Sequence, residues 1–180
     1  MDVRSLKRRG FLLLAAGGLA GCMAPPVVQG PVDKIAALTQ AIAALGPVDA
    51  AEAATAAQIA VLYSLELKRQ YGVTDPPLVH NTKVNMGLRP RGLCWHWADD
   101  LQARLAQEQF QTLDLHRAIA NATSVLIDHS TVVISAKGAT MEQGIVLDPW
   151  RHSGDLFWAR VPDDPRYTWE RRARVMARRR

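Results

Sequence analysis

The run from Thr123 to Ala136 constrains the fold more than any other part of the sequence, because it is rich in Val, Ile and Thr. This composition predicts a β-strand. Lys137-Gly138 directly after it predicts a turn, and the stretch from Gly144 to Asp148 predicts a second, shorter strand. The connection is short, so we expect the two strands to pair as neighbours in an antiparallel sheet.

Helical patterns precede these strands. The stretch from Val32 to Leu45 places apolar residues at three- and four-residue steps, which predicts a helix. Asp49 is a suitable N-cap for a longer helix from Ala50 to about Tyr71. The segment from Thr74 to Gly92 sustains no period and contains several prolines, so we expect an irregular loop there.

A third helix is predicted to begin at or near Cys94. Trp97, Leu101 and Leu105 recur at every fourth position and form one apolar stripe. Cys94 therefore falls in the first helical turn, where free backbone N–H groups and the positive end of the helix dipole stabilise an anion. This position predicts a thiol that is biased toward thiolate.

The C-terminal part is expected to complete the sheet and to add one helix. The stretch from Phe110 to Ile119 is predicted to be a strand or the approach to one, Asp155 to Val161 a strand, and Trp169 to Arg180 a closing helix. Helices followed by strands and a last helix indicate an α+β domain. We expect the N-terminal helices and the Cys94 helix to pack on a small antiparallel sheet.

Residues 1–21 have the features of a bacterial lipoprotein signal peptide, namely a basic start, a short apolar run and the lipobox Leu19-Ala20-Gly21-Cys22. We therefore expect cleavage before Cys22 and attachment of lipid to its thiol, which would tie the protein to a membrane. The segment from Lys7 to Leu12 also resembles a twin-arginine motif, so export by that route and by the Sec route both stay open.

A tether and one domain are expected after the signal peptide. Residues 22–31 contain three prolines and little charge, as expected of a tether, and residues 32–180 form the predicted domain. Met23 after the lipidated cysteine predicts the outer membrane, with the domain facing the periplasm.

Charge is distributed unevenly along the chain. The net charge of +5 divides into +3 for residues 1–21, +6 for residues 166–180 and −4 for the body between them. The body is mildly acidic, so we expect no nucleic-acid partner. Arginines near the C-terminal end of a helix match the helix dipole, and contact of this basic end with anionic lipid is the alternative.

Three residues could together form a nucleophilic site. Cys94 is the only thiol left if Cys22 is lipidated, and an unpaired cysteine in an exported protein is either buried and inert or kept for its reactivity. A thiolate nucleophile needs an imidazole within reach and a group that orients it. His129 lies inside the strongest predicted strand and Asp148 ends the next one, so their side chains could lie about 5 Å apart.

These motifs resemble those of the transglutaminase-like cysteine protease superfamily: Gly92-Leu93-Cys94-Trp95 at a helix start, His129 in a strand, and Leu147-Asp148-Pro149-Trp150 at the end of the next strand. The resemblance covers about residues 93–161 and implies a papain-like α+β core. It also implies that Cys94 is the nucleophile, His129 the general base and acid, and Asp148 the group that orients His129.

The activity implied by the resemblance is that of a cysteine hydrolase or acyltransferase, which acts on amide bonds through a thioacyl intermediate and needs no cofactor. Peptides or proteins would be the substrates, and peptide crosslinks of the cell wall are candidates in the periplasm. A non-catalytic binding lipoprotein on the same fold is the alternative function, because fold alone does not fix function.

Other residues compete for roles at this site. Asp128 is a second possible orienter, but as the strand neighbour of His129 it should point to the opposite face. His96 is a second possible base, but it should lie on a different side of the helix from Cys94. The other histidines have no metal-ligand spacing, so no zinc site is expected. The oxyanion donor is left open between the Cys94 N–H group and four further candidates: Asn81, Asn85, Trp95 and His96.

Overall fold

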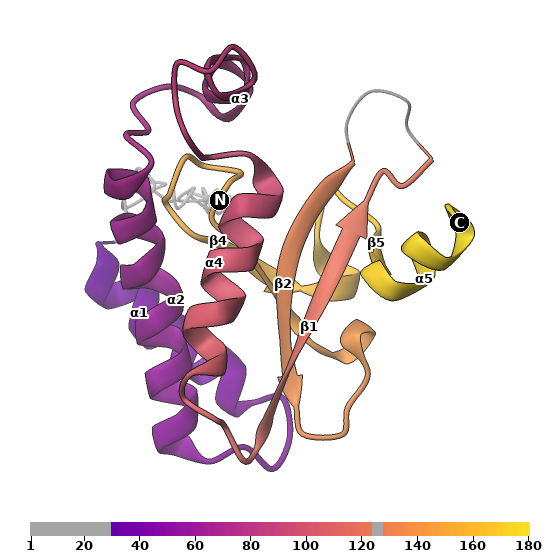
Figure 1. Ribbon diagram of the computed structural model, residues 1–180. Coiled ribbons are helices and arrows are strands. Elements are labelled where there is room, and N and C mark those ends of the chain that lie inside the picture. The colour runs from indigo at the N-terminus through magenta and orange to yellow at the C-terminus, as the bar shows by residue number, and fades with distance from the viewer. Residues whose placement is uncertain (1–29, 124–127) are drawn as a thin grey trace, which may run out of the picture.

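The computed structural model describes residues 30–123 and 128–180. Within these ranges the chain is a mixed α+β structure with five α-helices and one antiparallel sheet of five strands. The strands follow the order β4-β3-β2-β1-β5 across the sheet (Figure 1). Their bounds are β1 Leu113–Ala120, β2 His129–Ala136, β3 Ile145–Asp148, β4 Phe157–Arg160 and β5 Trp169–Arg171. The expected α+β class with a small antiparallel sheet is thus confirmed.

The helices lie mainly on one side of the sheet. Helices α1, α2 and α4 cover one face, and α5 lies beside β1 and the edge strand β5 (Figure 1). Their bounds are α1 Pro31–Ala43, α2 Ala50–Gln70, α3 Pro77–Asn85, α4 Cys94–Ala106 and α5 Arg172–Arg178. The Asp49 side chain accepts hydrogen bonds from the N–H groups of Ala51 and Glu52, so the predicted N-cap of α2 is present.

The core lies between the helices and strand β2, every residue of which is buried. Val132 and Ile134 face the helices and pack with Leu101 and Leu105 of α4. Val133, one residue along, faces the opposite side and packs in a second cluster. Because both faces of β2 are covered, its residues are buried without the alternation that a strand with one solvent-exposed face would show.

The expected irregular loop over Thr74–Gly92 is wrong, since it contains helix α3. Pro76 and Pro77 indicated a loop, but proline also suits the first turn of a helix, where its missing N–H is not needed. In α3 only His80 is buried, so the helix has no apolar stripe that the sequence pattern could reveal.

Two other boundaries differ from the prediction. The expected helix from Trp169 begins only at Arg172, because residues 169–171 pair with β1 as strand β5. The strand expected from Thr123 begins at His129, and Thr123 itself lies in a turn. His129 is therefore the first residue of its strand and not an interior one.

The predicted signal peptide, the lipidation site at Cys22 and most of the tether fall in residues 1–29, outside the described ranges. A search of the described helices found none that is both long and apolar enough to span a membrane.

Candidate active site

Cys94 is the first residue of α4, as the sequence predicted, and a tight turn precedes it. Gly92 in this turn has φ = +129°, and a Cβ atom there would lie 2.3 Å from Nε2 of His80, so only glycine fits. Nε2 of His80 lies 2.9 Å from the Arg91 carbonyl oxygen, and Trp97 Nε1 donates to the Gly92 carbonyl at 2.9 Å. Side chains on both sides thus hold the backbone that leads to the thiol.

The imidazole of His96 caps the same turn. Its Nδ1 accepts hydrogen bonds from the N–H groups of Gly92 (3.1 Å) and Leu93 (3.2 Å). Burial, together with the charge of Arg91, lowers the pKa of His96, so the ring stays neutral and Nδ1 keeps the lone pair that this capping needs. His96 therefore positions the turn before Cys94, and its Nδ1 is not free to serve as a base.

The thiol of Cys94 is nearly enclosed, with 7% of the residue exposed. Its Sγ donates a hydrogen bond to the Asp128 carbonyl oxygen at 3.7 Å. The N–H groups of Cys94 and Trp95, at the start of the helix, form no hydrogen bond with any residue in the described ranges. These two donors point outward from the helix end, as free N–H groups at helix starts do.

His129 and Asp148 form a buried pair. Nε2 of His129 lies 2.7 Å from Oδ2 of Asp148, and each side chain is 1% exposed. Pairing of β2 with β3, with Val132 opposite Leu147, places the two residues at the same end of the sheet. A buried carboxylate can only accept here, so Nε2 carries the proton and donates it toward Asp148.

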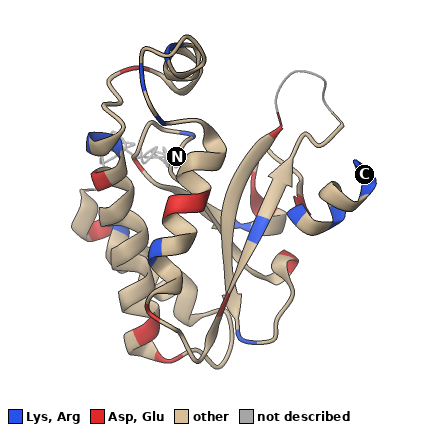
Figure 2. Cartoon of the chain, in the orientation of Figure 1, with Lys and Arg blue, Asp and Glu red and all other residues tan. Residues whose placement is uncertain are grey.

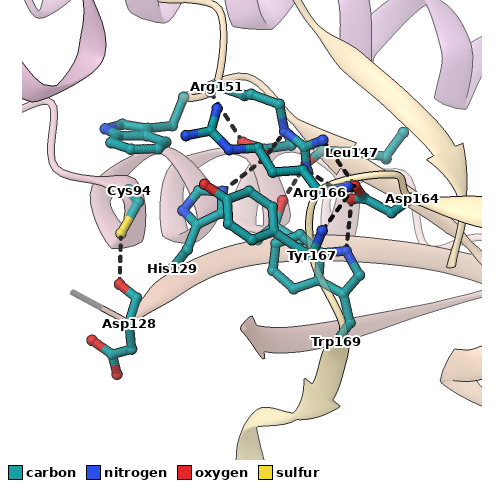
Figure 3. A network of polar contacts seen from close by, with 12 residues as sticks. Cys94, Asp128, His129, Leu147, Arg151, Asp164, Arg166, Tyr167 and Trp169 are labelled. Atoms are coloured by element: carbon teal, nitrogen blue, oxygen red, sulfur yellow. Dashed lines mark hydrogen bonds and ion pairs between the residues drawn. The ribbon is translucent and has the colours of Figure 1, made fainter. Parts of the chain in front are cut away.

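The other ring nitrogen of His129, Nδ1, is buried and has no hydrogen-bond partner among the residues that the structure describes. Such an atom calls for an explanation, because buried polar atoms are almost always paired. Figure 3 shows the imidazole between the thiol of Cys94 and the polar network around Arg151. The structure thus pairs His129 with Asp148 and places the thiol of Cys94 beside the imidazole.

The surroundings of His129 favour its cationic form. Burial opposes protonation, but the Asp148 carboxylate and the Cys94 sulfur outweigh it and raise the pKa of His129 to about 9. Asp128, the rival orienter, takes no part in this effect, because its carboxylate pairs with Arg179 at 2.7 Å. The raised pKa shows that the ring is held between two groups that favour its positive charge.

Asp148 is itself held by Arg151, a residue that the sequence analysis did not identify. Arg151 donates from Nε to Oδ2 of Asp148 at 3.0 Å and from its backbone N–H to Oδ1 at 3.2 Å. The far side of the guanidinium binds Asp164 in a bidentate pair at 3.0 and 2.7 Å (Figure 3). Burial raises the pKa of Asp164. Arg151, one backbone N–H group and one indole N–H group outweigh this effect and lower the pKa to about 2. The network continues from His129 through three charged side chains.

Aromatic rings enclose this network. The rings of Trp150, Tyr167 and Trp169 lie 4.6, 4.9 and 5.4 Å from that of His129, centroid to centroid. The guanidinium of Arg151 also lies 4.7 Å from the Tyr167 ring. These rings exclude water from the pair of His129 and Asp148, which strengthens its electrostatic interaction.

Asn81 contacts Trp150 and lines a hollow together with Cys94. Its Oδ1 accepts a hydrogen bond from Nε1 of Trp150 at 3.1 Å. An indole nitrogen can only donate, so this contact fixes which end of the amide faces Trp150 and leaves the NH₂ group free to donate elsewhere. Asn81 and Cys94 line the same hollow, of about 460 Å³. Of the four further oxyanion candidates, Asn81 is thus a donor with a fixed orientation beside the thiol.

Two hollows meet at Cys94. The first, toward α3, is lined mainly by apolar and amide side chains, and the second, of about 360 Å³, lies toward β1 and α5. Both include Cys94, Asp128 and the exposed ring of Trp95. A further hollow of about 560 Å³ lies between α2 and α4, but neither a cysteine nor a histidine lines it. The grooves at Cys94 are therefore the better candidates for substrate binding.

The raised pKa of His129 predicts how stability depends on pH. A folded-state pKa of about 9, against about 6.5 for a free histidine, contributes stability that is complete below pH 6.5 and is lost as pH rises toward 9. We expect the free energy of unfolding to fall by about 3 kcal/mol over this window. Urea unfolding at several pH values would measure it. The His129→Gln variant should lack most of this slope, and an equal slope in both proteins would contradict the assignment.

Sequence reasoning missed the residues that hold Asp148. Arg151 and Asp164 carry no motif, and buried charged residues are rare enough that their positions cannot be expected from a pattern. The one available signal was Arg151 close after the Asp148-Pro149-Trp150 segment. Comparison of the chain with protein-family models, curated proteins and solved structures gave no match.

Proposed function

We propose that the protein is a cysteine hydrolase or acyltransferase that acts on amide bonds, with Cys94, His129 and Asp148 as its triad on a papain-like core. The observation that carries this proposal is the state of His129, a buried imidazole with Nε2 on Asp148 and a free Nδ1 beside the only described thiol. His80 also has a buried ring nitrogen without a hydrogen-bond partner in the described ranges, so what distinguishes His129 is its pairing with Asp148 beside the thiol. The resemblance to transglutaminase-like cysteine proteases assigns the same three roles.

The reaction begins from a Cys94 thiolate paired with a His129 imidazolium that is protonated at Nδ1, because the raised pKa of His129 favours its cationic form at neutral pH. The sulfur attacks the amide carbonyl carbon, a C–S bond forms, and the carbonyl electron pair moves to oxygen. The oxyanion is stabilised by the N–H of Cys94 and the NH₂ group of Asn81. When the tetrahedral adduct collapses, the C–N bond breaks and Nδ1–H protonates the leaving amine.

The thioacyl-enzyme is then resolved by water or by a second amine. His129 takes a proton from this acceptor as it attacks the thioester carbonyl, and the sulfur leaves as thiolate. Asp148 keeps Nε2 protonated throughout, so that Nδ1 is always the nitrogen that exchanges protons. Arg151 and Asp164 hold Asp148 in place.

The proposed setting is the bacterial cell envelope. Lipid on Cys22 would anchor the protein to the outer membrane, residues 22–31 would act as a tether, and the domain would face the periplasm. Peptides and proteins of that compartment, cell-wall peptides among them, are the proposed substrates.

Incubation with a panel of N-acetyl-dipeptide p-nitroanilides tests this function. We expect release of p-nitroaniline together with an acyl mass on Cys94, seen in the intact protein after an acid quench. Cys94→Ala should abolish both signals, and Cys22→Ser, which removes the other cysteine, should leave them unchanged. If no member of the panel is cleaved and no acyl mass forms, the proposal loses its support.

A non-catalytic binding protein is the second candidate. The observation in its favour is that the thiol is almost fully enclosed and donates its hydrogen bond to the Asp128 carbonyl. In that case the hollows beside Cys94 would bind peptides without cleaving them, and the thiol would not react with electrophiles.

A further inference from the structure

The second hollow at Cys94, toward β1 and α5, leads away from the thiol to a cluster of arginines. Arg117 of β1 and Arg172 of α5 line this hollow together with Cys94. The same two arginines also line an adjoining hollow of about 270 Å³, which adds Arg171 and His116. The path from the thiol thus passes between two guanidinium groups and ends among them.

The acidic residues on this side are already paired with arginines, and one of these arginines is Arg117 itself. Asp99 pairs with Arg117, and Asp128 pairs with Arg179. Arg171 is 3.3 Å from a glutamate of the 3-10 turn that follows β2. Arg172, by contrast, forms no ion pair within the described ranges. The charge around the thiol is therefore balanced, while the outer end of the path carries an unmatched positive charge.

Figure 2 shows the basic positions along α5 and one on the neighbouring strand β1. His116 does not add to the charge. Its burial, with a contribution from Arg171, lowers the pKa of His116, and its Nε2 lies 2.8 Å from the Ser135 hydroxyl. The positive charge at the end of the path thus comes from guanidinium groups, which bind carboxylates in bidentate geometry.

Arg117 is held in a fixed position. Besides its ion pair with Asp99, its Nη2 donates to the Ser130 hydroxyl at 2.7 Å, and its side chain is only 13% exposed. Arg172 is exposed and can turn toward a ligand. Between them and the thiol, Ile119 and Met176 give the hollow an apolar surface. This arrangement suits a peptide segment whose aliphatic part lies beside the thiol and whose charged end reaches the arginines.

We propose that the substrate is an acidic peptide, which places a carboxylate on the α5 side of the scissile amide, where Arg172 and Arg117 bind it. This inference rests on the proposed function, since it names the substrate class of the same site. A substrate carboxylate is favoured over an anionic membrane surface, because the thiol and the two arginines line one hollow.

Thiol-reactive peptides of matched size test this preference. N-iodoacetyl-Gly-Asp-amide and N-iodoacetyl-Gly-Asn-amide differ only in charge, and both alkylate a cysteine. With the full chain carrying Cys22→Ser, so that Cys94 is the only thiol, we expect the Asp probe to react about fivefold faster than the Asn probe, the factor that about 1 kcal/mol gives. Probes with one and two additional glycines would show which spacing gives the largest ratio.

Two variants assign the effect. Arg172→Gln should bring the ratio of the two rates close to one by slowing the Asp probe, and an unchanged midpoint of urea unfolding shows that this variant is folded. Arg174→Gln, on the same helix but outside both hollows, should leave the ratio unchanged. Salt at about 0.5 M should reduce the ratio in the parent protein, because exposed charges are screened.

The possible failures can be told apart. A reactive thiol with a ratio of one, or a ratio that Arg172→Gln leaves unchanged, overturns the carboxylate preference and spares the proposed function. A thiol inert to both probes overturns both proposals. Binding to vesicles of anionic phospholipid that Arg172→Gln and Arg174→Gln weaken equally, combined with a ratio of one, would assign the arginines to a membrane surface instead.

Discussion

Replacing Asn81 by Ala is expected to slow the formation of the thioacyl-enzyme about 100-fold, because the variant loses one of two donors to the oxyanion. The orientation of Asn81 is set in advance by Trp150, whose Nε1 occupies its carbonyl oxygen. The NH₂ group is therefore ready before substrate binds and needs no reorganisation as charge develops. The rate of p-nitroaniline release during a single turnover would measure this loss.

Asn85 provides the matched control. It lies in the same helix and lines the same hollow as Asn81, but it is exposed, and the Trp150 indole donates to Asn81 instead. Asn85→Ala should therefore change the acylation rate by no more than about twofold, as expected for a surface change. Equal losses in the two variants would indicate a general effect of α3 on substrate binding. No loss in Asn81→Ala would remove this residue from the oxyanion site.

Replacing Arg151 by Ala is expected to destabilise the protein by about 3–5 kcal/mol, because it leaves the buried carboxylates of Asp148 and Asp164 without their shared cation. The side chains of Arg151 and Asp164 are 3% and 0% exposed, so water cannot replace the lost partner. Urea unfolding at pH 7 would measure the change. Arg174→Ala, at an exposed site, is the control and should change stability by less than about 0.5 kcal/mol.

A second variant distinguishes loss of charge balance from loss of packing. The guanidinium of Arg151 also lies 3.7 Å from the centre of the Phe157 ring, so its removal takes away contacts as well as charge. Adding Asp164→Asn to Arg151→Ala removes one of the two stranded carboxylates. We expect this double variant to recover part of the lost stability. A double variant less stable than Arg151→Ala would show that packing, rather than unpaired charge, dominates.

The parts of the fold that the sequence predicted are those with strong local signals. The apolar stripe of α4 and the Asp49 cap of α2 come from short-range periodicity and side-chain capping, and both are present. Helix α3 gave no such signal, because only His80 of its nine residues is buried. Strand β5 depends on pairing with β1, about fifty residues earlier in the chain, and no local pattern contains that information.

In the candidate site, too, only the residues with local sequence signals could be predicted. Cys94 could be placed at a helix start, and His129 and Asp148 could be expected on neighbouring strands, because helix and strand patterns fix those positions. The link from Asp148 through Arg151 to Asp164 could not be expected, since it depends on a bidentate contact between two loops. The same holds for the contact between Asn81 and Trp150, which joins residues 69 positions apart.

The measurement that tests the central claim most directly is the rate of Cys94 alkylation by iodoacetamide between pH 5 and 10, in the full chain with Cys22→Ser. A free thiol ionises near pH 8.5, so about 1% of it is reactive at pH 6.5. If His129 activates Cys94, the rate should already be high at pH 6.5 and should fall about 100-fold in His129→Ala. His152→Ala, at an exposed site, should leave it unchanged. A rate that rises only near pH 8.5 and is indifferent to His129→Ala would contradict the triad.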